Sequence, residues 1–221
     1  MIHLIIAQEP GMMDIITASP VASFIFAITI ATSLWAFYND NAYDNMILHP
    51  YSVSRGHRVY TVITSGLIHA DWMHLIFNML SYYFFAFALE VQLGHWQFGL
   101  LYVLSLILSD LPTVYKYRND DRYHSLGASG AVSAVIFGAI LFNPLGKMML
   151  MILPIPIPAV LFGALYLVYC NYASKHARDN INHDAHLFGA LSGLLITMAL
   201  APHVVHSFLE QISAGVQSWF H

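Results

Sequence analysis

The stretch GASGAVSAVIFGAILF, residues 127–142, decides the fold, because it joins a glycine-flanked serine to an apolar run. Ser129 stands between Gly127 and Gly130, where a loop is predicted to become a helix. Two other apolar runs open on a histidine, His74 before this stretch and His186 after it. Ionisable residues inside membrane segments are costly, so a serine and histidines at the mouths of such segments indicate chemistry.

The composition indicates a membrane protein. Only 9% of the residues are Asp, Glu, Lys or Arg and 58% are apolar, whereas soluble domains carry roughly a quarter charged residues. The net charge of -4 is small and mixed, so no nucleic-acid partner is expected. The single Cys170 excludes an internal disulfide and a cysteine metal cluster, and we interpret it as a packing residue. No metal or other cofactor is implied.

The apolar runs predict an all-α polytopic protein with six transmembrane helices, given that a span needs about 20 apolar residues. The spans are placed at about 20–38, 73–93, 97–115, 129–142, 149–171 and 185–201, and the fourth is short. The prolines at 154, 156 and 158 are expected to break the helix locally at the start of the fifth span. Residues 1–19 form an N-terminal segment without the pattern of a cleavable signal, 20–203 the membrane domain, and 204–221 a tail too polar for a seventh span.

This count predicts that the three motifs meet. Each even-numbered span enters the membrane from the same side, and these spans open at His74, Ser129 and His186. The alternation of topology therefore brings the three residues to one face, provided that the number of spans between them is right.

Ser129 and His186 fit nucleophilic catalysis. A serine hydroxyl needs a base to remove its proton, and histidine is the usual base near neutral pH. The unpaired N–H groups of a helix N-terminus suit the negative oxygen of a tetrahedral intermediate. Gly189 and Gly193 lie on one helix face and would let the fourth and sixth spans pack closely, which would bring Ser129 within hydrogen-bond reach of His186.

His74 and Asn78 are four residues apart, so both lie on one face of the second span and both can donate a hydrogen bond. Together with the backbone N–H of Ser129 they would form an oxyanion hole. Simpler interpretations stay open for each motif. Small residues such as these glycines are, by themselves, more often helix-packing positions. His186 could instead be bonded to a carbonyl or a lipid headgroup, and His74 and Asn78 could form a polar contact between helices.

In this order, the motifs resemble those of the rhomboid intramembrane serine proteases. The resemblance covers about residues 20–203 and is carried by His69, His74, Asn78, Gly127, Ala128, Ser129, Gly130, Ala185, His186, Gly189 and Gly193. It implies the basic six-span bacterial type, a rhomboid-like bundle with a short central fourth helix. It also implies a dyad of Ser129 as nucleophile and His186 as base, with Asn78, His74 and the Ser129 N–H at the oxyanion.

The resemblance also implies how the remaining parts work. The connection between the first two spans would be a partly embedded loop, and the fifth span would act as a gate over a water-filled cavity. His69 is interpreted as structural, bonding loop backbone. We expect His183 and Asp184, just before the sixth span, to lie in a solvated loop. Many relatives carry an aromatic residue four positions after the nucleophile, but this chain has Ser133. Either the Ser133 hydroxyl hydrogen-bonds His186, or a neighbouring aromatic residue such as Phe137 packs against the His186 ring.

The expected activity is endopeptidase cleavage of a membrane-protein substrate within the lipid bilayer, at a transmembrane segment that unwinds locally. The expected location is the bacterial cytoplasmic membrane, with the active site toward the outside. Counting Lys and Arg favours the opposite orientation, since seven of the eight lie on the side of the motifs. Two rival functions remain: a catalytically silent rhomboid-like protein that binds membrane clients, and a histidine-lined metal transporter.

Overall fold

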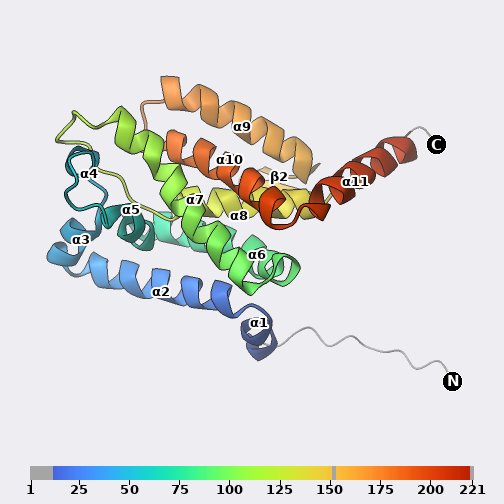
Figure 1. Cartoon of the computed structure of the whole chain (residues 1–221), viewed down its shortest axis with the longest axis horizontal. Helices are drawn as coiled ribbons and strands as arrows, with labels where there is room; N and C mark the ends of the chain where they lie inside the picture. Colours follow the sequence, from blue (N-terminus) through green and yellow to red (C-terminus); the bar gives the residue numbers. More distant parts are fainter. Residues whose placement is uncertain (1–11, 151–152, 220–221) are drawn as a thin grey trace.

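The computed structural model describes residues 12–150 and 153–219, which form a bundle of helices with one small hairpin (Figure 1). The elements are α1 (Met12–Ala18), α2 (Pro20–Phe37), α3 (Asp40–Met46), α4 (Pro50–Val53), α5 (Thr61–Thr64), the 3-10 turn η1 (Ser65–Leu67), α6 (Trp72–Leu93), α7 (His95–Lys116), α8 (Ser129–Phe142), β1 (Lys147–Leu150), β2 (Leu153–Pro158), α9 (Ala159–His176), α10 (His183–Leu200) and α11 (His203–Trp219). The first eleven residues of the predicted N-terminal segment lie outside this description.

Helix α8 forms the centre of the bundle. It packs against α6, α7 and α10, and also contacts α9 and α11 (Figure 1). A helix that is apolar on all faces has to be buried, and ten of its fourteen residues are buried. The short central helix expected at 129–142 is therefore present with these bounds.

The long helices have the character of membrane spans. Of the described helices, α2, α6 and α7 are long and apolar enough to cross a membrane, and α10 passes only together with α11, across a bend of 110°. Large apolar side chains point outward around the bundle, among them Phe84, Leu165 and Leu195, each more than half exposed. Length and composition thus support three or four spans directly, fewer than the six predicted.

The structure is mostly helical, as predicted, and differs from the prediction at the start of the fifth span. Residues 147–150 and 153–158 form an antiparallel hairpin, and α9 begins only at Ala159. The reason is local, because the prolines at 154, 156 and 158 lack the N–H groups that a helix interior requires. Proline is tolerated in an edge strand, where its missing donor can face away from the ladder.

Two capping interactions fix the helices that carry the motifs. The Asp71 carboxylate accepts the N–H of His74 at 2.8 Å, and so begins α6 just before the predicted span. The Asn182 side chain accepts the N–H of Ala185 at 3.1 Å, and so begins α10 two residues earlier than predicted. Such caps satisfy N–H groups that the helix itself leaves free.

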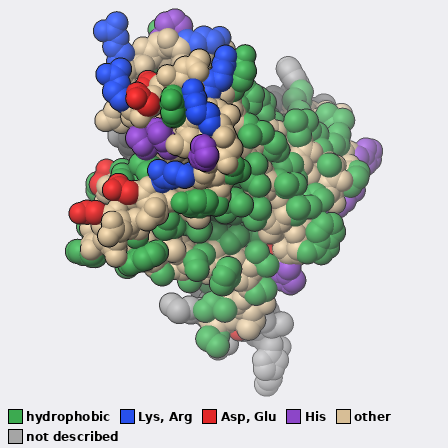
Figure 2. All heavy atoms as spheres, turned by 60° about the vertical axis from the view of Figure 1, so that its left-hand side comes forward, with side chains coloured by type: hydrophobic (Ala, Val, Ile, Leu, Met, Phe, Trp, Pro, Cys, Tyr) green, Lys and Arg blue, Asp and Glu red, His purple; other side chains and the backbone are tan. Residues whose placement is uncertain are grey.

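The buried Glu90 anchors the opposite end of α6. Its carboxylate accepts the backbone N–H groups of Val21 at 3.1 Å and Ala22 at 2.6 Å, and it contacts Nδ1 of His95 at 2.6 Å. The charge therefore caps the N-terminus of α2, where the helix dipole favours an anion. Lys and Arg gather at the other end of the molecule (Figure 2).

Candidate active site

The loop before α8 holds Ser129 in a constrained position. Gly127 has a φ of +114°, a backbone conformation that residues with a side chain rarely adopt. A Cβ at this position would lie 2.5 Å from Cε1 of His74. The N–H of Gly127 donates to the carbonyl of Ser65 at 2.9 Å. Ser129 is the first residue of α8, so its N–H belongs to the free donors of a helix N-terminus. Only glycine fits at 127, for both space and torsion.

His69 ties this loop to the rest of the fold. Its Nε2 accepts the N–H of Ala128 at 3.5 Å, and its Nδ1 contacts Oγ of Ser33 at 2.9 Å, a serine that also donates to the Leu67 carbonyl at 3.1 Å. The ring is fully buried, and this burial lowers the pKa of His69 to about 3, with the nearby His74 adding to the effect. A neutral ring is the form that can accept on one nitrogen and donate on the other.

Helices α8 and α10 touch along their backbones. A Cβ on Gly189 would lie 2.8 Å from the carbonyl carbon of Gly130 and 3.0 Å from its Cα. One turn further on, a Cβ on Gly193 would lie 2.5 Å from Cα of Ala134. The close crossing expected from these glycines is therefore present, and it brings the first turns of the two helices together.

A cavity of about 790 Å³ opens between these first turns and the surrounding helices. Its lining includes all four side chains that the sequence singles out for chemistry: His74, Asn78, Ser129 and His186. They come from α6, α8 and α10, three helices far apart in the sequence. The prediction that they share one face rests on an alternation of spans, and the fold brings them to one cavity.

Ser129 and His186 share the cavity but are not hydrogen-bonded to each other in the part of the chain that the structure describes. The dyad of Ser129 and His186 therefore stays a prediction, supported by the cavity that both residues line. Hydrogen bonds between a nucleophile and its base often tighten only when substrate binds. A rotation of two side chains on adjacent first turns is the movement that such tightening requires.

Tyr166 of α9 supplies an aromatic neighbour for His186. The two rings stack with centroids 6.4 Å apart and planes 18° apart. The Tyr166 hydroxyl lies 3.1 Å from Oγ of Ser133, and Phe137 packs against the ring at 5.8 Å. Ser133 thus bonds Tyr166 and not His186, and Phe137 contacts the Tyr166 ring, so the aromatic neighbour of His186 is Tyr166 and not Phe137. The sequence gives no signal for Tyr166, because α9 carries three tyrosines and periodicity does not say which of them faces α10.

Asn78 is placed to donate into the cavity. One of its amide N–H groups donates to the His74 carbonyl at 3.0 Å, which leaves the second N–H free for another acceptor. The His74 ring lies beneath Gly127 and meets the His69 ring edge to face at 4.9 Å. These two residues and the Ser129 N–H therefore form a group of donors on one side of the cavity.

The residues before His186 differ from the expected solvated loop. His183 lies in the first turn of α10 and is only 5% exposed, with its Nε2 3.1 and 3.2 Å from the carboxylate oxygens of Asp179. Asp184 pairs with Lys116 at 2.6 Å. The earlier helix start explains the difference, and the spacing of 183 and 186 could have indicated it, since residues three apart share a helix face.

Comparisons with known proteins agree with this architecture. A family model described as the Rhomboid domain matches residues 56–203. "Putative rhomboid protease YdcA" of Bacillus subtilis is 33% identical over 191 residues, which cover 80% of this chain and 87% of that protein. RHOMBOID-like protein 12, mitochondrial, of Arabidopsis thaliana is 26% identical over 71% of this chain and 51% of that protein. Rhomboid protein 1, mitochondrial, of Saccharomyces cerevisiae is 33% identical over 72% and 47%. The chain thus spans most of the bacterial relative and about half of each mitochondrial one.

Proposed function

The chain belongs to the rhomboid family of membrane proteins, and we propose that it is an intramembrane serine endopeptidase that uses Ser129 and His186. One observation carries the proposal. A serine at a helix N-terminus, a histidine on a closely crossing helix and an amide donor on a third helix line the same cavity. Polar groups are costly in an apolar bundle and indicate a functional site by default, so their convergence on one cavity supports the proposal.

The proposed chemistry follows from these positions. His186 takes the proton of the Ser129 hydroxyl while Oγ attacks the carbonyl carbon of the scissile peptide bond. The negative oxygen that forms is bound by the Ser129 N–H, the free amide N–H of Asn78 and the His74 ring. The protonated His186 then gives its proton to the leaving amine. A water molecule from the cavity hydrolyses the acyl-enzyme by the same route in reverse.

The proposed substrate is a membrane protein whose transmembrane segment unwinds easily. A peptide bond inside a helix is shielded by the surrounding backbone, so local unwinding is needed before Ser129 can reach it. We expect α9, as the gate, to move aside and admit the substrate from the bilayer. The hairpin before α9 and the open connection after it, residues 177–182, leave that helix fewer contacts than α8 has.

We further propose six spans, with α8, α9 and α10 as the three that fall short of a full crossing by length or composition. The active site faces outward from a bacterial cytoplasmic membrane. The Lys and Arg near the cavity do not oppose this orientation strongly, because several are held in the fold. Arg55 donates to the carbonyls of Tyr51 and Arg118 at 2.8 Å, and Lys116 is paired with Asp184 at 2.6 Å. Charges held in this way are less informative about insertion than charges in a free loop.

The test is cleavage of a fluorogenic transmembrane substrate by purified protein in detergent. We expect Ser129→Ala and His186→Ala to abolish cleavage while thermal unfolding shows both variants folded. Ser213→Ala and His206→Asn, on the exposed part of α11, are matched controls and should cleave like the parent. Full activity in Ser129→Ala would refute the mechanism. A folded parent that binds the substrate but never cuts it would favour the client-binding alternative.

A further inference from the structure

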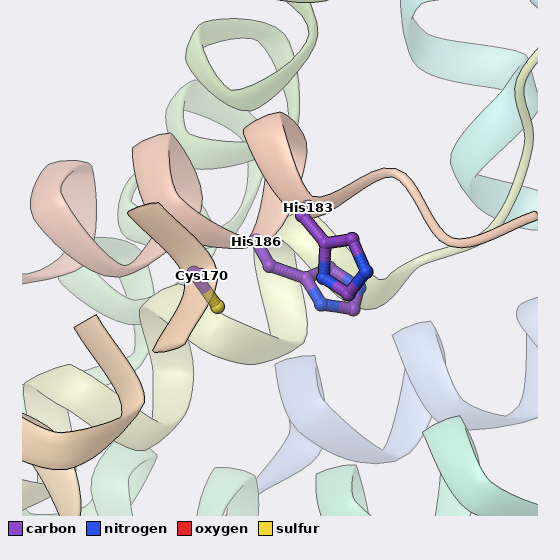
Figure 3. Close-up of side chains that lie close together, drawn as sticks. All are labelled: Cys170, His183 and His186. Carbon is purple, nitrogen blue, oxygen red and sulfur yellow. The ribbon is translucent and has the colours of Figure 1, made fainter. Parts of the chain in front are cut away.

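A second cluster of reactive groups lies beside the proposed base. Cys170 points from α9 toward His183 and His186 on the first turn of α10 (Figure 3). One donor atom of each residue lies within 4.8 Å of the donor atoms of the other two. Cys170 is fully buried and His183 is 5% exposed. Thiol and imidazole are the donors that zinc prefers in proteins.

His183 is oriented as a metal ligand would be. Its Nε2 faces the carboxylate of Asp179, at 3.1 and 3.2 Å, so the proton of the neutral ring is held on that nitrogen. This leaves Nδ1 as a free acceptor, and it is buried without a hydrogen-bond partner among the described residues. A buried polar atom left without a partner is uncommon and costly. A carboxylate behind a histidine is also the usual outer arrangement of zinc sites.

We infer that Cys170, His183 and His186 form a binding site for a zinc ion. Bond lengths of about 2.3 Å to sulfur and 2.0–2.1 Å to nitrogen place tetrahedral ligands roughly 3.5 Å apart. The donor atoms therefore need to close by only about 1 Å, which side-chain rotation on two packed helices supplies. Zinc displaces the thiol proton of Cys170, which leaves as a hydrogen ion into the cavity water. That water also provides the fourth ligand, since His183 and His186 both line the cavity.

A bound zinc ion would inhibit the protease. This consequence rests on the proposed function, whereas the binding of zinc does not depend on it. A neutral imidazole has one nitrogen with a free lone pair. Once that nitrogen of His186 is bound to zinc, the ring has no place for the proton of Ser129, whichever nitrogen the metal takes. Zinc is therefore expected to inhibit reversibly, and a chelator to restore the activity.

Metal binding is tested by titrating purified, metal-free protein in detergent with Co²⁺, which takes the place of zinc and is visible by absorption. We expect one equivalent to produce tetrahedral cobalt bands and a thiolate-to-cobalt charge-transfer band, both removed by added Zn²⁺. Ser129→Ala, which cannot cleave, should give the same spectrum. Cys170→Ser should lose the charge-transfer band, and Asp179→Asn, an exposed carboxylate, should weaken binding about 10- to 100-fold. His206→Asn removes an exposed histidine that pairs with Glu210 away from the proposed site, and the cobalt spectrum of this control should equal that of the parent.

Inhibition is tested on the cleavage assay with Zn²⁺ and EDTA. We expect zinc to inhibit the parent and His206→Asn at the same concentration. With each rate expressed relative to that variant's rate without zinc, Cys170→Ser should need at least tenfold more zinc for half-inhibition. A missing cobalt spectrum, or one unchanged in Cys170→Ser, would overturn the site. A normal spectrum without inhibition would overturn the regulatory role alone. If the parent never cleaves, the proposed function fails, but the cobalt spectrum still decides the metal site.

Discussion

The backbone contact between α8 and α10 can be tested by adding a single methyl group. In Gly189→Ala the new Cβ would overlap the carbonyl oxygen of Gly130 and would lie 2.8 and 3.0 Å from the carbonyl carbon and the Cα of that residue. Nonbonded heavy atoms normally approach to about 3.5–4.0 Å, so the two helices have to separate by roughly 1 Å. Backbone cannot rotate away as a side chain can, and the separation therefore reaches the first turns, where Ser129 and His186 lie.

Two magnitudes follow from this displacement. Overpacking of this kind costs about 1–3 kcal/mol of stability. A misplacement of 1 Å can lower a rate about 100-fold, and we expect kcat for Gly189→Ala to fall roughly 30- to 100-fold. Gly99→Ala is the matched control, because Gly99 also lies within a long helix and its added Cβ would meet only Cγ1 of Val21, at 3.4 Å. That contact is ordinary, so Gly99→Ala should keep full activity and gain about 0.5–1 kcal/mol of helix stability.

The assay measures kcat and KM on the fluorogenic transmembrane substrate, well below the unfolding temperature of each variant. Thermal unfolding in the same detergent gives the stability change separately. If Gly189→Ala cleaves within twofold of the parent while it is folded, then the crossing does not control the geometry of the site. If Gly99→Ala loses as much activity as Gly189→Ala, the effect is a general one of added bulk and the reasoning also fails.

Three further predictions concern other parts of the fold. Tyr166→Leu should lower kcat by about 2- to 13-fold with little change in KM, because the stacked aromatic contact with His186 contributes about 0.5–1.5 kcal/mol. Tyr166→Phe keeps the ring and should lose less activity than Tyr166→Leu; equal losses would contradict a role for the ring. Glu90→Gln should lower the unfolding free energy by about 1.5–3 kcal/mol, through the loss of charge-assisted hydrogen bonds to the start of α2, while folded protein keeps its kcat. Folding lowers the pKa of His69 to about 3, against about 6.5 in the unfolded chain. Between these pH values the unfolded chain binds more protons than the folded one. The free energy of unfolding therefore falls as the pH drops below about 6.5, by up to about 1.4 kcal/mol per pH unit. His69→Gln should flatten that slope in denaturation measured from pH 7 to 4, and an unchanged slope would assign it to other groups.

The parts of the site that the sequence predicts are those fixed by helix periodicity and by chain alternation. The short apolar run after Ser129 predicts a buried central helix, and the glycines at 189 and 193 predict its closest neighbour. The convergence of His74, Ser129 and His186 needs only the number of crossings between them. These features are local patterns combined with a count, so they do not depend on how any helix is rotated.

The parts that the sequence does not predict depend on tertiary choices. Which tyrosine of α9 faces His186 follows from the rotation of that helix against α10, and no local pattern encodes it. His183 is buried because the Asn182 side chain caps α10 and the helix begins two residues before the predicted start. The polar residues of this stretch predict a loop instead. The prolines after α8 predict the break in the helix, but they do not predict that β1 pairs with β2 across it.

The position of Tyr166 connects the proposed gate to the proposed base. In the family pattern the ring beside the catalytic histidine comes from the helix of the nucleophile, which is fixed at the centre of the bundle. Here it comes from α9, and Cys170 lies one turn further along the same helix. Moving α9 outward would therefore remove the stacking partner of His186 and the sulfur ligand of the metal site together. Zinc held by Cys170, His183 and His186 would keep α9 against α10, so metal and substrate should each weaken the binding of the other by the same factor. Equal cobalt affinity with and without a saturating transmembrane substrate on Ser129→Ala would show that α9 does not move in this way.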